Sequence, residues 1–198
     1  EMEDLGLDNT SWHLFSVLSR LYSNPVESTI RELCTNCGDA HIMSRNESKP
    51  FIIKLPNVDA NIYTLSFRDF GPGLNHEQIH SIYKWYGRST KTKSNEVTGC
   101  LGLGSKSPYS ISSTFYVKSY NNGKCSQYTC TKNNEGKPNV SKDPIVFDSA
   151  EENGLEVTIP FYKEVNFLEI LPRVLKHFKI KPLVFKQMGE LERDIPID

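Results

Sequence analysis

Three polar side chains at helical spacing constrain this chain more than any other feature. Glu32, Asn36 and Asp39 are separated by four and then by three residues. At about 3.6 residues per helical turn, these offsets fall within an arc of roughly 60°. A helix over this stretch therefore presents a carboxylate, an amide and a second carboxylate in one row. The alternative is an ordinary solvated face, and the motifs further along the chain bear on that choice.

The helix itself is predicted by its start and by an apolar stripe. Asn24-Pro25-Val26-Glu27 reads as a capping box with proline at the first helical position. We therefore expect a helix that begins at Pro25 and runs to about Met43. Apolar residues recur on the face beside the polar row, which can anchor the helix in a core. This stripe consists of Val26, Ile30, Leu33 and Cys37.

Composition limits the class of protein. The 198 residues suit one domain, and 37% apolar residues can build a sizeable core. A formal net charge of −1 gives no reason to expect a nucleic acid or a membrane surface as partner. No apolar run reaches membrane-spanning length. The five cysteines lack a framework spacing, which favours a reducing compartment, and Cys34 and Cys37 lack the second pair that a structural zinc site needs.

The remaining patterns predict an α+β fold. Asn122-Gly123 between two alternating runs is a strong hairpin signal, and the polar stretch 88–98 is predicted as a loop. Further helices are predicted over 11–22, 75–86 and 167–178, the last interrupted near Pro172, and strands over 51–55, 62–69, 114–120, 124–131 and 154–161. We expect a two-layer sandwich with helices on one face of a mixed, mostly antiparallel sheet.

A glycine motif follows the second predicted strand. In Asp69-Phe-Gly-Pro-Gly73 the aspartate ends the apolar face of that strand. A carboxylate in this position is either paired or lines a pocket. The two glycines allow a sharp turn and the close approach of a flat ligand. The carboxylate could then accept a hydrogen bond from an exocyclic amine such as that of adenine, whereas a plain turn is the alternative.

A second glycine motif is Gly99-Cys-Leu-Gly-Leu-Gly-Ser-Lys-Ser107. Exposed backbone N–H groups that lead into a helix make an anion site, and a flexible loop is the alternative. The segment is not an ordinary P-loop, because Ser105 intervenes between Gly104 and Lys106 and because no buried apolar strand precedes it. A GxGxxG dinucleotide fingerprint is absent as well.

With these motifs the chain resembles the GHKL (Bergerat-fold) ATPases, which include gyrase B subunits, heat-shock-ninety chaperones and sensor histidine kinases. The three motifs occur in the family's order. The matching residues are Glu32, Asn36, Asp39 and Ala40 in E-x-x-x-N-x-x-D-A, Asp69, Gly71 and Gly73 in D-x-G-x-G, and Gly99, Gly102 and Gly104 in the glycine-rich lid.

Within that superfamily, stretches 31–36, 68–73 and 102–108 are most similar to the rapid-lysis A (rIIA-like) proteins of large tailed bacteriophages. This resemblance implies that residues 1–198 are a single ATP-binding domain, the amino-terminal part of a longer protein. It also implies a role in lysis timing and a location in the host cytoplasm, peripheral to the inner membrane.

The resemblance further implies a Mg²⁺-dependent ATP site with slow hydrolysis coupled to lid closure. Glu32 would activate the attacking water, Asn36 would ligate Mg²⁺ through its amide oxygen, and Asp69 would hold adenine. The lid glycines and Lys106 would neutralise the phosphates. The nucleotide-binding residues that it implies are Asn36, Asp39, Asp69, Gly71, Gly73, Gly99, Leu101, Gly102, Leu103, Gly104, Ser105, Lys106 and Thr158.

One position departs from the family pattern. Many members carry Gly-Thr at the start of a late strand, and this chain has Gly154-Leu155 there. Either water or Thr158 replaces the missing hydroxyl, or adenine is held more weakly.

Three alternatives stay open. His76-Glu-Gln-Ile-His80 matches the zincin HExxH pattern, with Glu96 as the candidate third ligand, although His76 falls in the exposed first turn of a short helix. A non-catalytic nucleotide-binding scaffold would keep the same motifs. A histidine kinase shares the pocket, but Glu32 favours hydrolysis. Beyond an adenine nucleotide, the expected partners are a second copy on ATP binding or another phage protein.

Overall fold

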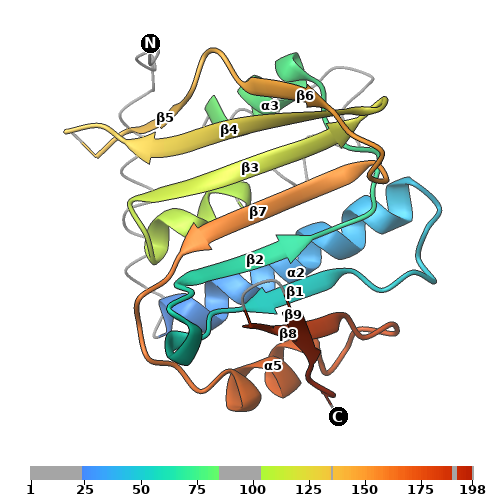
Figure 1. Cartoon of the computed structure of the whole chain (residues 1–198), viewed down its shortest axis with the longest axis vertical. Helices are drawn as coiled ribbons and strands as arrows, with labels where there is room; N and C mark the ends of the chain where they lie inside the picture. Colours follow the sequence, from blue (N-terminus) through green and yellow to red (C-terminus); the bar gives the residue numbers. More distant parts are fainter. Residues whose placement is uncertain (1–23, 85–103, 135, 189–190, 198) are drawn as a thin grey trace.

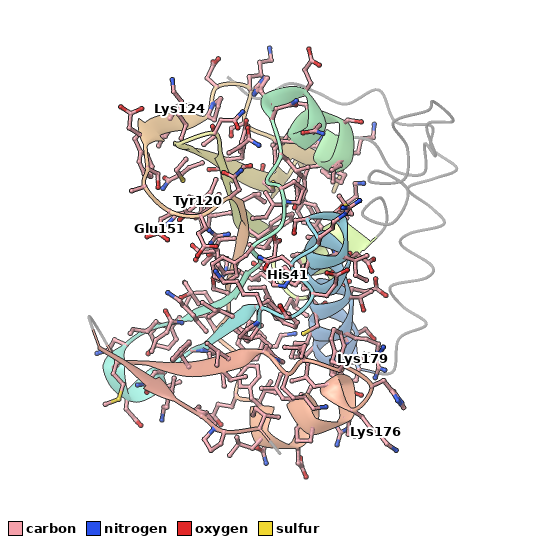
Figure 2. All side chains as sticks on the ribbon, turned by 90° about the vertical axis from the view of Figure 1, so that its right-hand side faces the viewer. His41, Tyr120, Lys124, Glu151, Lys176 and Lys179 are labelled. Carbon is pink, nitrogen blue, oxygen red and sulfur yellow. The ribbon has the colours of Figure 1, made fainter. Side chains whose placement is uncertain are left out.

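The computed structural model describes residues 24–84, 104–134, 136–188 and 191–197. These residues form an α+β fold in which one mixed sheet carries helices on one side, as predicted (Figures 1 and 2). The predicted helix over 11–22, the predicted loop over 88–98 and the motif residues 99–103 lie outside the described parts. None of the helices in the described parts combines the length and the apolar character needed to cross a bilayer.

The sheet has the strand order β5-β4-β3-β7-β2-β1-β8-β9, and β6 also pairs with β4. Only β1 and β8 pair in parallel among the described strands, and the other pairs are antiparallel. The strands are β1 Ile52–Leu55, β2 Thr64–Arg68, β3 Thr114–Asn121, β4 Lys124–Lys132, β5 Pro138–Val140, β6 Ile145–Asp148, β7 Gly154–Pro160, β8 Leu183–Met188 and β9 Leu191–Asp194.

The described helices begin and end close to the predicted residues. α2 spans Pro25–Met43, and the side chain of Asn24 caps it by accepting a hydrogen bond from the Glu27 N–H at 3.1 Å. The other helices are α3 His76–Lys84, α5 Phe167–Leu175 and the short 3₁₀ helices η1 Val58–Ala60 and η2 Gly104–Ser110. α5 ends three residues before the predicted end, and Lys181 donates a hydrogen bond to its last carbonyl, that of Leu175.

The core lies between the sheet and the helices. The predicted apolar stripe of α2 is buried along its length. It packs on side chains that alternate along β2 and β7, because every second residue of a strand faces the same side. The facing residues are Leu65 and Phe67 of β2 and Leu155, Val157 and Ile159 of β7. α2 is therefore held against the middle of the sheet, with its polar row beside this contact.

Candidate functional site

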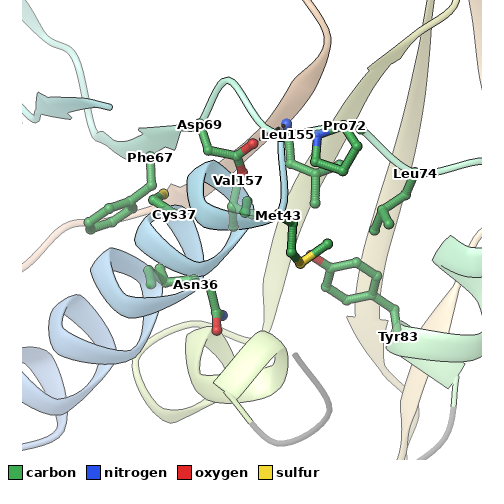
Figure 3. A pocket seen from close by; sticks show the side chains of 13 residues that line it. Asn36, Cys37, Met43, Phe67, Asp69, Pro72, Leu74, Tyr83, Leu155 and Val157 are labelled. Atoms are coloured by element: carbon green, nitrogen blue, oxygen red, sulfur yellow. Dashed lines mark hydrogen bonds between the residues drawn. The ribbon is translucent and has the colours of Figure 1, made fainter. Parts of the chain in front are cut away.

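A pocket lies where α2 meets the end of β2 and the start of β7 (Figure 3). Its cavity volume is only about 30 Å³, within a space of about 510 Å³ that includes open solvent. Most of its lining is apolar, and two polar side chains reach it. The lining includes Asn36, Met43, Asp69, Leu74, Tyr83 and Leu155. This composition suits a flat, mostly apolar ligand that presents few polar groups.

Asp69 is the buried acid of the pocket. Its Oδ1 accepts hydrogen bonds from the backbone N–H groups of Gly71 at 2.9 Å and of Leu155 at 3.1 Å. Burial raises the pKa of this carboxyl from 3.8 to about 6, although the two N–H groups and the nearby Arg68 oppose the shift. Oδ2 has no hydrogen-bond partner among the described residues. The pocket therefore contains one carboxylate oxygen that is free to accept a hydrogen bond.

The glycine loop, residues 69–73, needs both of its glycines for packing. A Cβ at Gly71 would lie 2.7 Å from the Cβ of Ala40 in α2. Gly73 has φ +70°, and a Cβ there would collide with the carbonyl oxygen of Tyr120 in β3. The loop is thus pressed between α2 and the sheet, which brings the predicted second motif against the first.

The polar row of α2 forms as predicted, but its members differ in position. Asn36 lines the pocket, and in Figure 3 its amide points toward η2. Glu32 and Asp39 are half-buried on the same row and do not line the pocket. Burial also raises the pKa of Asp39. The structure therefore brings Asn36 and Asp69 to one cavity and places Glu32 one turn along the helix from Asn36.

η2 carries the described part of the third motif and packs on α2. The hydroxyl of Thr29 donates a hydrogen bond to the Ser107 carbonyl at 3.1 Å. The hydroxyl oxygens of Ser105 and Ser107 are buried, and neither has a hydrogen-bond partner among the described residues. Lys106 is fully buried, which lowers its pKa to about 7, and it does not line the pocket. Gly104 begins η2, whereas Gly99, Leu101, Gly102 and Leu103 lie outside the described residues.

The structure corrects the assignment of Thr158. Leu155 and Val157 of β7 face the pocket, so Thr158 faces the other side of the sheet. Its hydroxyl there lies 3.3 Å from that of Ser66. Thr158 therefore does not replace the missing threonine hydroxyl at Leu155. Instead, the backbone N–H of Leu155 binds Asp69 directly, and the Leu155 side chain becomes part of the apolar wall.

The two histidines of the HExxH pattern have an aromatic neighbour. Their rings lie 4.3 Å apart, and Nδ1 of His76 lies 3.1 Å from the Tyr128 hydroxyl. Among the described residues no three His, Cys, Asp or Glu side chains form a group that could hold a metal ion. Glu96 lies outside those residues. The described structure thus gives this pair a packing role against β4.

Sequence reasoning missed the apolar walls. Met43, Leu74 and Tyr83 line the pocket from three different segments. No local pattern marks them, because each is an ordinary apolar residue of its own element. The alternation of β2 and β7 could have identified Phe67 and Leu155 as neighbours of Asp69, had the pairing of these strands been known.

Neither the family models nor the curated proteins with which the chain was compared match it. The functional conclusion therefore depends on the motifs and on the geometry of the pocket.

Proposed function

We propose that this chain is a Bergerat-type domain that binds ATP with Mg²⁺ and hydrolyses it slowly. The observation that carries the proposal is Oδ2 of Asp69, which accepts no hydrogen bond from the described residues, in a mostly apolar pocket that Asn36 also lines. Residues of the first two motifs that resemble those of GHKL ATPases line this pocket, and the described part of the third packs on α2. The apolar wall of the pocket suits the base of ATP, and the polar groups around it suit the metal-bound triphosphate.

The composition of the apolar part of the pocket suits a purine, for which its side chains would have to move apart. Adenine presents an exocyclic amine, which can donate to Oδ2 of Asp69 because the two backbone N–H groups already occupy Oδ1. Guanine presents a carbonyl oxygen at the same position, which a carboxylate would repel. The walls formed by Met43 and Leu155 supply apolar contact for the ring faces. We therefore expect a preference for adenine over guanine.

The other polar groups fit a metal-bound triphosphate. Asn36 would hold Mg²⁺ through its amide oxygen, a ligand type that this ion accepts. The orphaned hydroxyls of Ser105 and Ser107 lie in the segment packed on α2 and could donate to phosphate oxygens. Bound Mg²⁺ would supply charge neutralisation of the phosphates. These donor and acceptor types suit Mg·ATP.

Glu32 is the candidate general base. It lies one helical turn from Asn36 on the same half-buried row, so a carboxylate stands next to the position expected for the phosphates. In this role it orients the attacking water and accepts its proton. Closure of the lid over the nucleotide would make the output a conformational switch. The lysis-timing role and an ATP-dependent homodimer are part of the same proposal.

Titration calorimetry with Mg·ATP, Mg·ADP and Mg·GTP, and with ATP plus a chelator, tests binding. Phosphate release measured on the same samples tests turnover. Glu32→Ala should bind ATP and lose turnover, whereas Glu47→Ala, at an exposed glutamate beyond α2, should retain both. Lack of ATP binding by the wild-type chain would refute the proposal, and full turnover by Glu32→Ala would remove Glu32 from its role.

A non-catalytic nucleotide-binding scaffold is the second candidate. Two observations favour it: Lys106 is buried away from the pocket, and Leu155 offers no side-chain hydroxyl to the base. This candidate predicts ATP binding without phosphate release above background. Size-exclusion chromatography with and without ATP then tests whether binding alone brings two copies together.

A further inference from the structure

Two side chains hold the peptide group between Asp69 and Phe70. Its carbonyl oxygen accepts a hydrogen bond from Nη1 of Arg68. Its N–H donates to Nε2 of His41 at 2.8 Å. In a trans peptide the carbonyl and the N–H point in opposite directions, so the two side chains approach the group from opposite sides.

Arg68 holds this peptide from the sheet face that carries no helix. Its guanidinium is almost fully buried and lies 4.7 Å from the ring centre of Phe70 and 4.3 Å from that of Tyr120. Nη2 donates to the carbonyl of Glu152, in the loop before β7. Arginine can make both bonds because its donors form a rigid planar fork.

The start of β7 is built around this contact. Gly154 has φ +142°, and a Cβ there would collide with the carbonyl oxygen of Asp69 and with Nη1 of Arg68. Leu155 follows directly and donates its N–H to the Asp69 carboxylate. The same guanidinium thus links the end of β2 to the strand that binds the carboxylate.

His41 holds the peptide from the helix side. It is a buried residue near the end of α2, and Figure 2 shows it between this helix and the sheet, with Tyr120 on the sheet's other side. Because Nε2 accepts the Phe70 N–H, the ring proton must be on Nδ1, which donates to the Lys49 carbonyl at 3.0 Å. His41 is therefore neutral and fixed in one tautomer.

We propose that Arg68 and His41 are positioning residues that together hold the Asp69–Phe70 peptide and so aim the Asp69 carboxylate at the base. This inference rests on the proposed function and deepens it. The Asp69 side chain leaves the chain at one end of this peptide and the Gly71 N–H lies just beyond the other, whereas Leu155 is fixed in β7. Rotation of the peptide would therefore move the carboxylate away from the Gly71 and Leu155 N–H groups that it binds. Oδ2 would then lose its fixed direction.

The test compares deletion and rescue variants. His41→Leu and Arg68→Met remove the two bonds, and His41→Gln keeps an acceptor and a donor on one side chain. Gln187→Met is the matched control, because the Gln187 amide donates to the Leu55 and Thr64 carbonyls at the other end of β1 and β2. For each variant we would measure the Kd for Mg·ATP and for Mg·GTP, and hydrogen exchange of the Phe70 amide.

His41→Leu and Arg68→Met should each weaken ATP binding by about 10-fold or more and reduce the ATP-over-GTP preference by a similar factor. His41→Gln should restore both values to within about threefold, and Gln187→Met should leave the preference unchanged. A merely structural role would not alter base preference selectively. In His41→Leu the Phe70 amide should exchange faster than in the wild type, and in His41→Gln it should stay protected.

Wild-type base preference in both deletion variants would overturn the proposal, and so would an equal loss of preference in Gln187→Met. If the wild-type chain bound neither nucleotide, the proposed function would fail by itself. Exchange of the Phe70 amide would then decide whether the two side chains hold the peptide: equal protection in His41→Leu and the wild type would overturn that part as well.

Discussion

Replacement of Asp69 by asparagine should stabilise the protein and abolish adenine binding. In the folded chain, Oδ1 accepts the Gly71 and Leu155 N–H groups. An asparagine can keep both bonds through its amide oxygen. Its amide nitrogen then takes the place of Oδ2 and carries no charge, so the cost of burying an ionised group disappears.

The size of the effect follows from the pKa of the carboxyl. Burial raises this pKa from 3.8 to about 6. Each pKa unit corresponds to about 1.4 kcal/mol, so an ionised Asp69 lowers the free energy of unfolding by up to about 3 kcal/mol at pH 8. Because the folded-state pKa is raised, the favourable contribution of Asp69 is fully present below pH 3.8 and is lost as the pH rises through 6. Asp69→Asn and the wild type should therefore converge near pH 4.

Urea unfolding of both proteins between pH 4 and pH 8 measures this difference. The matched control is Asp59→Asn, which removes a carboxylate whose side chain is 92% exposed instead of a buried one. The Asp69→Asn variant should also bind adenine nucleotides much more weakly, because its amide NH₂ and the exocyclic amine of adenine are both hydrogen-bond donors and would face each other. The loss should be about 3 kcal/mol, more than 100-fold in Kd.

A destabilised Asp69→Asn at pH 8 would contradict this reasoning, as would a stability difference that does not vary with pH. Retention of wild-type ATP affinity would contradict the second half. The two halves are independent, since unfolding is measured without nucleotide.

Three further predictions follow from the same structure. ATP affinity of the wild-type chain should fall as the pH drops through about 6, the pKa of Asp69. The proton must go to Oδ2, because Oδ1 accepts two N–H groups, and Oδ2 then becomes a donor that can no longer accept a hydrogen bond from adenine. Calorimetry at pH 5, 6 and 8 measures this change in affinity. Gly73→Ala should lower the free energy of unfolding by roughly 3 kcal/mol or more, because a left-handed backbone and a collision with a carbonyl of β3 both destabilise the folded state. Gly123→Ala, at φ +74° in open space, should lower it by only about 1 kcal/mol. Equal losses of the two variants in urea unfolding would contradict the collision. Thr29→Val should cost about 1 kcal/mol, since it removes the bond to the Ser107 carbonyl, and a faster exchange of amides in η2 should accompany it.

Much of the site was determined locally by the sequence. The Asn24 cap and the apolar stripe were sufficient to predict α2, because capping and 3.6-residue periodicity act within a few residues of chain. The row of Glu32, Asn36 and Asp39 followed from that helix alone. Likewise, the alternation of the second predicted strand placed Asp69 at the end of its apolar face, where the structure has it.

The tertiary structure decided which strands are neighbours and which face each residue takes. β5, β6, β8 and β9 were not predicted, because short strands at or near a sheet edge gain their regular structure from pairing rather than from their own sequence. The three or four residues of β5 and β6 illustrate this. The fold class survived these omissions, since the central strands define it.

The pairing of β2 with β7 had the largest consequence for the site. It turned Thr158 away from the pocket and brought the backbone N–H of Leu155 to Asp69. A one-residue change of register would exchange these faces. The alternation of Leu155, Val157 and Ile159 with polar residues favours the observed face, but it does not identify β2 as the partner strand. The sequence by itself therefore determined which chemical groups are present on each element. Long-range packing determined which of those groups meet, because it decides which strands pair and which segments lie against one another.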